Sequence, residues 1–185
     1  NPKINVSAPH MHYRGLMHLA LHFPKSATQP GHNENGWSWL WRVCWWGAPS
    51  IRILDVGCGT GFMTKALYDL ATRLGYRAHV KGIDCVRALI DKAKALHAPH
   101  ASMTFDVCDV NHLPVRTPGY HFIHAGFMLN PAQWARLRGC LAEEGWLVGP
   151  LDGAWTQTSK HAPNVEIGPV QYIGDTSPGR PVGCT

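Results

Sequence analysis

A short stretch in the middle of the chain combines one acid with three closely spaced glycines. Residues 51–61 read Ile-Arg-Ile-Leu-Asp-Val-Gly-Cys-Gly-Thr-Gly, so an apolar run ends in Asp55 and then in glycines at alternate positions. Glycines there let a ligand approach bare backbone and permit a positive φ. A dinucleotide-binding loop would place its third glycine at position 62, which is Phe62. The stretch therefore predicts a ligand loop between a strand and a helix, with another kind of nucleotide-binding α/β domain as the alternative.

The Asp-x-Gly-x-Gly-x-Gly form resembles motif I of the S-adenosylmethionine-dependent methyltransferases, which implies S-adenosyl-L-methionine as cofactor. Two further acids follow later predicted strands, Asp84 at the tip of the second and Asp109 just past the third. An acid at the tip of the second strand is well placed to accept hydrogen bonds from both ribose hydroxyls of an adenosyl group. Asp109 is the natural partner of the adenine amine. A helix N-cap or a solvated loop residue is the alternative for each acid.

The elements that position these residues alternate along the chain. The hydrophobic pattern predicts helices over residues 11–23, 61–74, 86–97 and 131–141, and strands over 51–56, 78–83, 102–107, 120–125, 145–149 and 165–173. Such alternation predicts an α/β fold, and the motif I resemblance makes it Rossmann-like, a mostly parallel seven-stranded sheet with helices on both faces. We expect a single methyltransferase domain over residues 1–185, with an insertion at about 24–49 that contains five of the eight tryptophans.

Several other segments resemble one family, the protein-L-isoaspartate O-methyltransferases, which repair damaged aspartyl and asparaginyl residues. Residues 6–12, Val-Ser-Ala-Pro-His-Met-His, look like the substrate-side signature of that family. Residues 120–126 are similar to its strand ending in Ile-His-x-Gly, and residues 141–150 to a later strand, with Glu144 where a glycine is usual. Residues 170–176 resemble its last strand and threonine.

This resemblance implies an activity and a role for each matching residue. The activity is methylation of isoaspartyl carboxylates, and Ser7 matches the active-site serine whose hydroxyl contacts the substrate carboxylate. The residues that match the cofactor contacts are His12, Asp55, Gly57, Gly59, Asp84 with its neighbour Cys85, Asp109 and Thr176. A carboxylate is already ionised at neutral pH, so methyl transfer to it needs no general base. Ser7 would position the acceptor rather than attack, and an N-cap of the following helix is its alternative role.

Three departures from the family pattern concern the acceptor side. Phe-Met-Leu at residues 127–129 replaces a run of small alanines, so these side chains either narrow the cleft or turn into the core. The tryptophan-rich insertion at 24–49 is expected to pack on the domain or to bind a protein or RNA partner. The family also carries a further helical segment before residue 6, which we expect to be cleaved, supplied by a partner or lost.

Composition narrows the remaining possibilities. The formal net charge of +5 comes without a Lys/Arg run, so it is weak evidence for an acidic partner. Six scattered cysteines predict reduced thiols and an intracellular location, cytoplasmic or mitochondrial, rather than a disulfide framework. The close histidine pairs lack a third ligand, so no metal site is expected. No apolar stretch has the length of a membrane span, so no membrane partner is expected.

Two alternatives to the repair enzyme stay open. The first is a catalytically degenerate member kept as a structural subunit of a larger assembly, such as a ribonucleoprotein of the mitochondrial ribosome type. This alternative is favoured by the tryptophan-rich insertion, the positive net charge and the bulky residues at 127–129. The second is a methyltransferase acting on RNA or another acceptor, for which Asn130-Pro131 is only a fragment of the expected catalytic motif.

Overall fold

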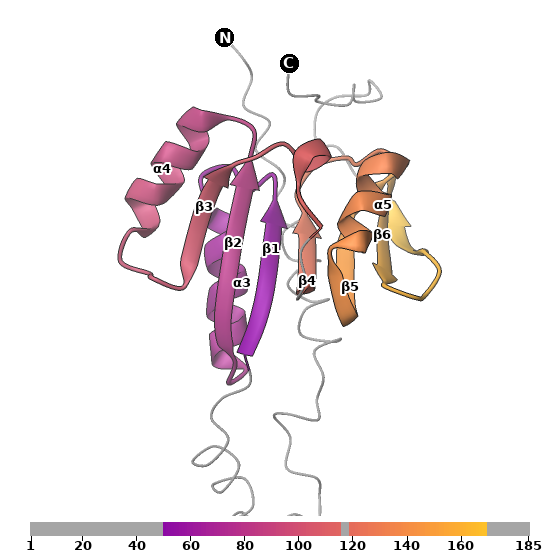
Figure 1. Cartoon of the computed structure of the whole chain (residues 1–185), viewed down its shortest axis with the longest axis horizontal. Coiled ribbons are helices and arrows are strands. Elements are labelled where there is room, and N and C mark those ends of the chain that lie inside the picture. Colours follow the sequence, from indigo (N-terminus) through magenta and orange to yellow (C-terminus); the bar gives the residue numbers. More distant parts are fainter. Residues whose placement is uncertain (1–49, 116–118, 170–185) are drawn as a thin grey trace, which may run out of the picture.

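The computed structural model describes residues 50–115 and 119–169 (Figure 1). The predicted helix over 11–23 and the insertion at 24–49 lie outside this part of the chain, so the single domain and its insertion stay predictions. The elements are β1 (Ser50–Val56), α3 (Phe62–Arg73), β2 (Arg77–Asp84), α4 (Arg87–His97), β3 (Met103–Val107), the 3-10 helix η2 (Val110–His112), β4 (Tyr120–Ala125), α5 (Pro131–Gly139), β5 (Leu141–Leu151), β6 (Ala154–Ser159) and β7 (Val165–Pro169).

Seven strands form one sheet in the order β3-β2-β1-β4-β5-β6-β7. The first five strands are parallel, β6 runs antiparallel to β5, and β7 runs antiparallel to β6. The predicted α/β fold with a mostly parallel seven-stranded sheet is confirmed. The hydrophobic pattern did not predict β6, which pairs with β5 across the turn at Asp152 and Gly153. Both turn residues have positive φ, 50° and 87°, as in the two-residue turns that suit the twist of a hairpin.

Helices cover both faces of the sheet because successive strands are added in two opposite directions from the centre of the sheet. It goes from β1 outward to β2 and β3, and later from β4 outward to β5. Since such crossovers are right-handed, α3 and α4 lie on one face and α5 on the other. Figure 1 shows α3 behind the sheet and α5 in front of it. The point where the direction reverses lies between β1 and β4, and open α/β sheets bind ligands beside such a point.

Two apolar clusters, one on each face, hold the sheet in place. Leu67 of α3 packs with Ile53 and Phe122 in one cluster, and Trp134 of α5 packs with Leu54 and Ile123 in the other. The carboxyl-terminal halves of β1 and β4 are buried on both sides, whereas β2 alternates between buried and exposed residues over its first half. This core fixes the carboxyl ends of β1, β2, β3 and β4, where the candidate site lies.

Candidate functional site

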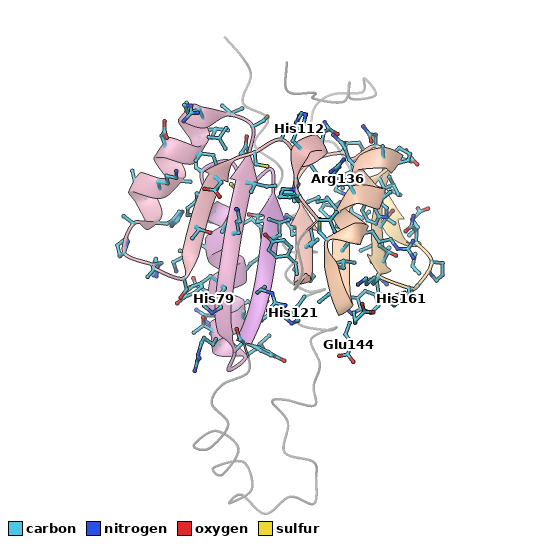
Figure 2. All side chains as sticks on the ribbon, viewed as in Figure 1. His79, His112, His121, Arg136, Glu144 and His161 are labelled. Carbon is cyan, nitrogen blue, oxygen red and sulfur yellow. The ribbon has the colours of Figure 1, made fainter. Side chains whose placement is uncertain are left out.

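A cavity of about 250 Å³ lies across the carboxyl ends of the central strands. Its walls come from the ends of β1 and β2, the start of α4, the loop between β3 and η2, the residues after β4, and α5. The lining residues are Val56, Gly57, Ile83, Asp84, Cys85, Val86, Leu89, Cys108, Asp109, Val110, Asn111, Phe127 and Gln133. Figure 2 shows His112 and Arg136 near this end of the sheet, and His79 and His121 at the opposite end.

The glycine loop joins β1 to α3 beside the cavity. The backbone of Gly57 has φ of 73° and that of Gly59 has φ of 55°, a region that other residues enter at a cost. The amides of Gly57 and Cys58 both donate to the carbonyl of Ile83, at 2.8 and 3.0 Å. The loop is therefore tied to the end of β2, and Gly57 forms part of the cavity wall. Its predicted contact with a cofactor stays a prediction.

Asp84 lies between the glycine loop and the start of α4. Its Oδ2 accepts a hydrogen bond from the amide of Gly59 at 3.0 Å, and its Oδ1 accepts one from the amide of Val86 at 2.9 Å. A carboxylate has about four lone-pair positions, so it can accept further hydrogen bonds from a ligand in the cavity. The acid predicted to contact ribose hydroxyls is thus fixed by two backbone amides in the cavity wall.

Asp109 occupies the other acidic position, after β3. Its Oδ1 accepts hydrogen bonds from the amide and from the side-chain nitrogen of Asn111, at 2.9 and 3.0 Å, and caps η2. Nδ1 of His112 lies 3.7 Å from its Oδ2. Asp109 therefore has the alternative role expected for it, a helix cap, and it also lines the cavity. Asp109 can cap η2 and still bind a ligand, because among the described residues its Oδ2 has only the 3.7 Å contact with His112.

The walls between the two acids are apolar. Ile83, Val86, Leu89 and Val110 contribute aliphatic side chains to the same cavity. An apolar slot with carboxylates at its rim suits a nucleoside, whose flat base is apolar on both faces and whose hydroxyls and amine are hydrogen-bond donors. The residues present therefore fit the adenosyl part of S-adenosylmethionine. These walls could not be predicted from the sequence, since aliphatic residues at strand and helix ends carry no chemical signature.

Asp55, the acid of the glycine motif, lies behind the loop and does not line the cavity. It is 1% exposed. Its Oδ2 accepts a hydrogen bond from Thr64 Oγ1 at 2.6 Å, and its Oδ1 lies 2.8 Å from Nδ1 of His124. These contacts give Asp55 a structural role, since they join β1 to α3 and β4 just before the loop begins. A direct contact with the methionine part of a cofactor stays a prediction.

The three bulky residues after β4 have three different environments. Leu129 is 1% exposed and belongs to the core, as one of the two expectations had it. Phe127 lines the cavity, and its ring lies against Gly57. The Met128 sulfur accepts a weak hydrogen bond from the amide of Gly153 at 3.4 Å. Phe127 is therefore the residue of this group that narrows the site.

The cysteines near the cavity are not activated nucleophiles. Burial raises the pKa of the Cys58 thiol far above its usual value, and the charges of Asp55 and Asp84 raise it further. Burial also raises the pKa of Cys108. Cys58, Cys108 and Cys140 are free thiols, but Cys85 takes part in a disulfide bond. The expectation of reduced thiols is therefore wrong for Cys85, which lines the cavity.

Ser7, His12 and Thr176 lie outside the described residues, so their predicted roles stay predictions. Within residues 50–115 and 119–169, no group of three or more His, Cys, Asp or Glu side chains gathers as a metal site would need. No helix in this same part of the chain is long and apolar enough to cross a membrane.

Comparison with protein families matches residues 53–145, half of the chain, to the methyltransferase domain. The chain belongs to this family. It is an enzyme of the methyltransferase class, and its cofactor is S-adenosylmethionine, as the glycine motif predicted. The matched segment runs from β1 into β5 and contains the glycine loop, both cavity acids and Phe127.

One solved structure has a similar fold over most of this chain. A candidate protein-L-isoaspartate O-methyltransferase from Plasmodium falciparum, in complex with S-adenosyl-L-homocysteine, is 19% identical over 94% of this chain and 76% of that one, with a TM-score of 0.63. An S-adenosylmethionine-dependent methyltransferase from Mesorhizobium loti is 19% identical over 55% of this chain, with a TM-score of 0.45. The present chain spans 47% of the length of the Mesorhizobium protein. A search of curated proteins finds no match.

Proposed function

We propose that the chain transfers a methyl group from S-adenosylmethionine to isoaspartyl carboxylates in damaged proteins. The proposed cofactor site is supported by one observation, which is that two acids, Asp84 and Asp109, line one apolar cavity. The proposed acceptor is supported by the resemblance of residues 6–12 to the substrate-side signature. It is also supported by the name of the Plasmodium falciparum structure, whose fold is similar over 94% of this chain.

In this proposal the cavity holds the adenosyl group lengthwise across the strand ends. Asp84 accepts hydrogen bonds from the ribose hydroxyls, Asp109 accepts one from the adenine amine, and Val86 and Leu89 pack against the base. The rest of the cofactor extends toward Gly57, where the Phe127 ring lies in this structure. When bound, the cofactor supplies an electrophilic methyl group on a sulfonium.

The residues of the chain then have to orient an anion and exclude water. An isoaspartyl carboxylate is ionised at neutral pH, so no base is required. The thiol within the loop, Cys58, stays protonated because burial raises its pKa. Direct transfer to the acceptor oxygen is therefore the reaction that this site supports. Ser7 would hold that oxygen in line with the methyl carbon, about 3–3.5 Å away.

The test is transfer of a labelled methyl group to an isoaspartyl peptide beside the same peptide with a normal aspartyl residue. We expect label on the isoaspartyl peptide only, and a large loss of turnover in Ser7→Ala with unchanged cofactor affinity. The Ser7→Thr variant, which retains the hydroxyl, serves as the matched control. Equal labelling of both peptides, or of neither with cofactor bound, would contradict the proposed acceptor.

A second candidate function is favoured by the position of Phe127. Because its ring lies over Gly57, the second candidate is a member of this enzyme family that has lost turnover and serves as a subunit of a larger, ribonucleoprotein-type assembly. A failure to bind S-adenosylhomocysteine even when Phe127 is replaced by Ala would favour this candidate. Binding with turnover would exclude it.

A further inference from the structure

Phe127 packs directly on the backbone of the glycine loop. A Cβ atom added to Gly57 would lie 2.5 Å from Cδ1 of Phe127 and 3.1 Å from its Cε1. Both residues line the cavity. The ring therefore fills the space above Gly57 that the absence of a side chain leaves open.

Phe127 and Asp109 mark opposite ends of the cavity. Asp109 follows β3 and Phe127 follows β4, and these strands are three places apart in the sheet order. At about 4.8 Å between neighbouring strands, the two strand ends are roughly 14 Å apart. A ligand whose base lies near Asp109 and whose sugar lies near Asp84 therefore has its remaining part directed at Phe127.

The backbone around Phe127 is anchored on both sides. The amide of Gly126 donates to the carbonyl of Val56 at 2.9 Å, and the amide of Leu129 donates to the carbonyl of Pro150 at 2.9 Å. These bonds tie the segment to β1 and β5. Clearing the space above Gly57 therefore requires rotation of the Phe127 side chain rather than movement of the loop.

The free space is small for a whole cofactor. The cavity measures about 250 Å³, below the roughly 300–1,000 Å³ of sites that bury drug-sized ligands. With Phe127 in place, the part of the cavity beside the acids suits a nucleoside. The amino-acid part of S-adenosylmethionine would meet the ring.

We propose that Phe127 is a side-chain gate on the methionine end of the cofactor cavity, closed in this structure. This inference rests on the proposed placement of the cofactor. The apparent affinity for the full cofactor equals the intrinsic affinity multiplied by the fraction of molecules in which the gate is open. A gate that is open in a tenth of the molecules therefore weakens the apparent affinity about tenfold. It leaves adenosine binding unaffected, because adenosine ends before the gate.

Calorimetric titration of the whole protein with adenosine and with S-adenosylhomocysteine tests the gate. In the wild type we expect the two affinities to be similar. In Phe127→Ala the affinity for S-adenosylhomocysteine should rise at least tenfold, with adenosine binding unchanged. Phe127→Leu, which is less disruptive to packing, should give a smaller gain in the same direction. Met128→Ala, outside the cavity lining, is the matched control and should alter neither affinity.

The outcomes separate the gate from the function on which it rests. Adenosine binding with no gain for S-adenosylhomocysteine in either Phe127 variant would overturn the gate alone. A loss of S-adenosylhomocysteine affinity in both variants would also overturn it and would make the ring a wall that contacts the cofactor. No binding of either compound to any variant that still melts cooperatively would overturn both the gate and the proposed cofactor site.

Discussion

Asp55 Oδ1 lies 2.8 Å from Nδ1 of His124, and each of these side chains is only 1% exposed. The two residues are register partners on the parallel strands β1 and β4, the strands between which the sheet changes direction. Thr64 of α3 donates to the other oxygen of Asp55. The acid of the glycine motif thus joins two strands and a helix directly below the ligand loop.

Replacing His124 tests this arrangement. In His124→Leu the Asp55 carboxylate stays buried and loses one donor, so we expect the free energy of unfolding to fall by about 3–5 kcal/mol. His124→Asn can place an amide nitrogen near the position of Nδ1. We therefore expect its free energy of unfolding to fall by no more than half as much as that of His124→Leu. Urea denaturation of the three proteins checks this. Equal losses in both variants would mean that ring packing, including the stack of His124 on Trp155, dominates instead.

Asp84 is expected to be essential for cofactor binding. In Asp84→Ala we predict at least a 100-fold loss of affinity for S-adenosylhomocysteine, because each hydrogen bond to a charged acceptor contributes about 1.5–3 kcal/mol. A smaller loss of stability should accompany it, since Asp84 also holds the amides of Gly59 and Val86. Asp106→Ala is the control, because Asp106 is exposed and paired with Lys81 outside the cavity lining. Normal calorimetric affinity in the Asp84 variant would refute the ribose contact.

The two glycines of the loop should respond differently to alanine. Gly59→Ala meets nothing within 4 Å, so it should cost only the left-handed backbone conformation, about 1–2 kcal/mol. Gly57→Ala has the same backbone cost, and its new methyl group also overlaps the Phe127 ring. This overpacking should lower the free energy of unfolding by about a further 1–3 kcal/mol. In the double variant with Phe127→Ala the second cost should disappear, and a double-mutant cycle on unfolding free energies measures it. A coupling energy near zero would contradict the contact.

His121 should make stability depend on pH. Burial, followed by the positive charge of Arg52, lowers the pKa of His121 in the folded protein. Its Nδ1 accepts a hydrogen bond from the Arg52 amide, which requires the unprotonated ring. The unfolded chain takes up this proton near pH 6.5, so stability is complete above that pH and is lost as the pH falls toward the lower, folded value.

The check is urea denaturation of the wild type and of His121→Asn at pH 7.5 and pH 5. We expect the wild type to lose more stability between the two than the Asn variant, in which the group does not titrate. The control is His79→Asn, on β2 at the same end of the sheet and exposed (Figure 2). If the His121 variant keeps the full pH dependence, another group is responsible.

Much of the fold could be predicted from the sequence because its signals are local. The strand over 120–125 and the helix after 86 follow from apolar periodicity, and both are found within a residue of the expected bounds. The hairpin strand β6 was missed because its alternating sequence, Ala-Trp-Thr-Gln-Thr-Ser, is mostly polar. Its partner β5 is also longer than the predicted strand, beginning at Leu141.

The site was predictable only where residue type carries the chemistry. Asp84 and Asp109 could be singled out because carboxylates at strand ends are few, and both line the cavity, while their cofactor contacts stay predictions. The partnership of Asp55 with His124 could not, since it depends on the register of strands 69 residues apart. Asn130, weighed as a fragment of a catalytic motif, is the N-cap of α5 in a capping box with Gln133. That pattern, Asn-Pro-x-Gln, was readable from the sequence.

A crystal structure of the whole protein with S-adenosylhomocysteine would show whether the cavity between Asp84 and Asp109 holds the cofactor. We predict the ribose hydroxyls within hydrogen-bonding distance of the Asp84 carboxylate, the adenine amine beside Asp109, and the Phe127 ring rotated away from Gly57. A ligand bound elsewhere, or bound in this cavity without contact to either acid, would contradict this prediction.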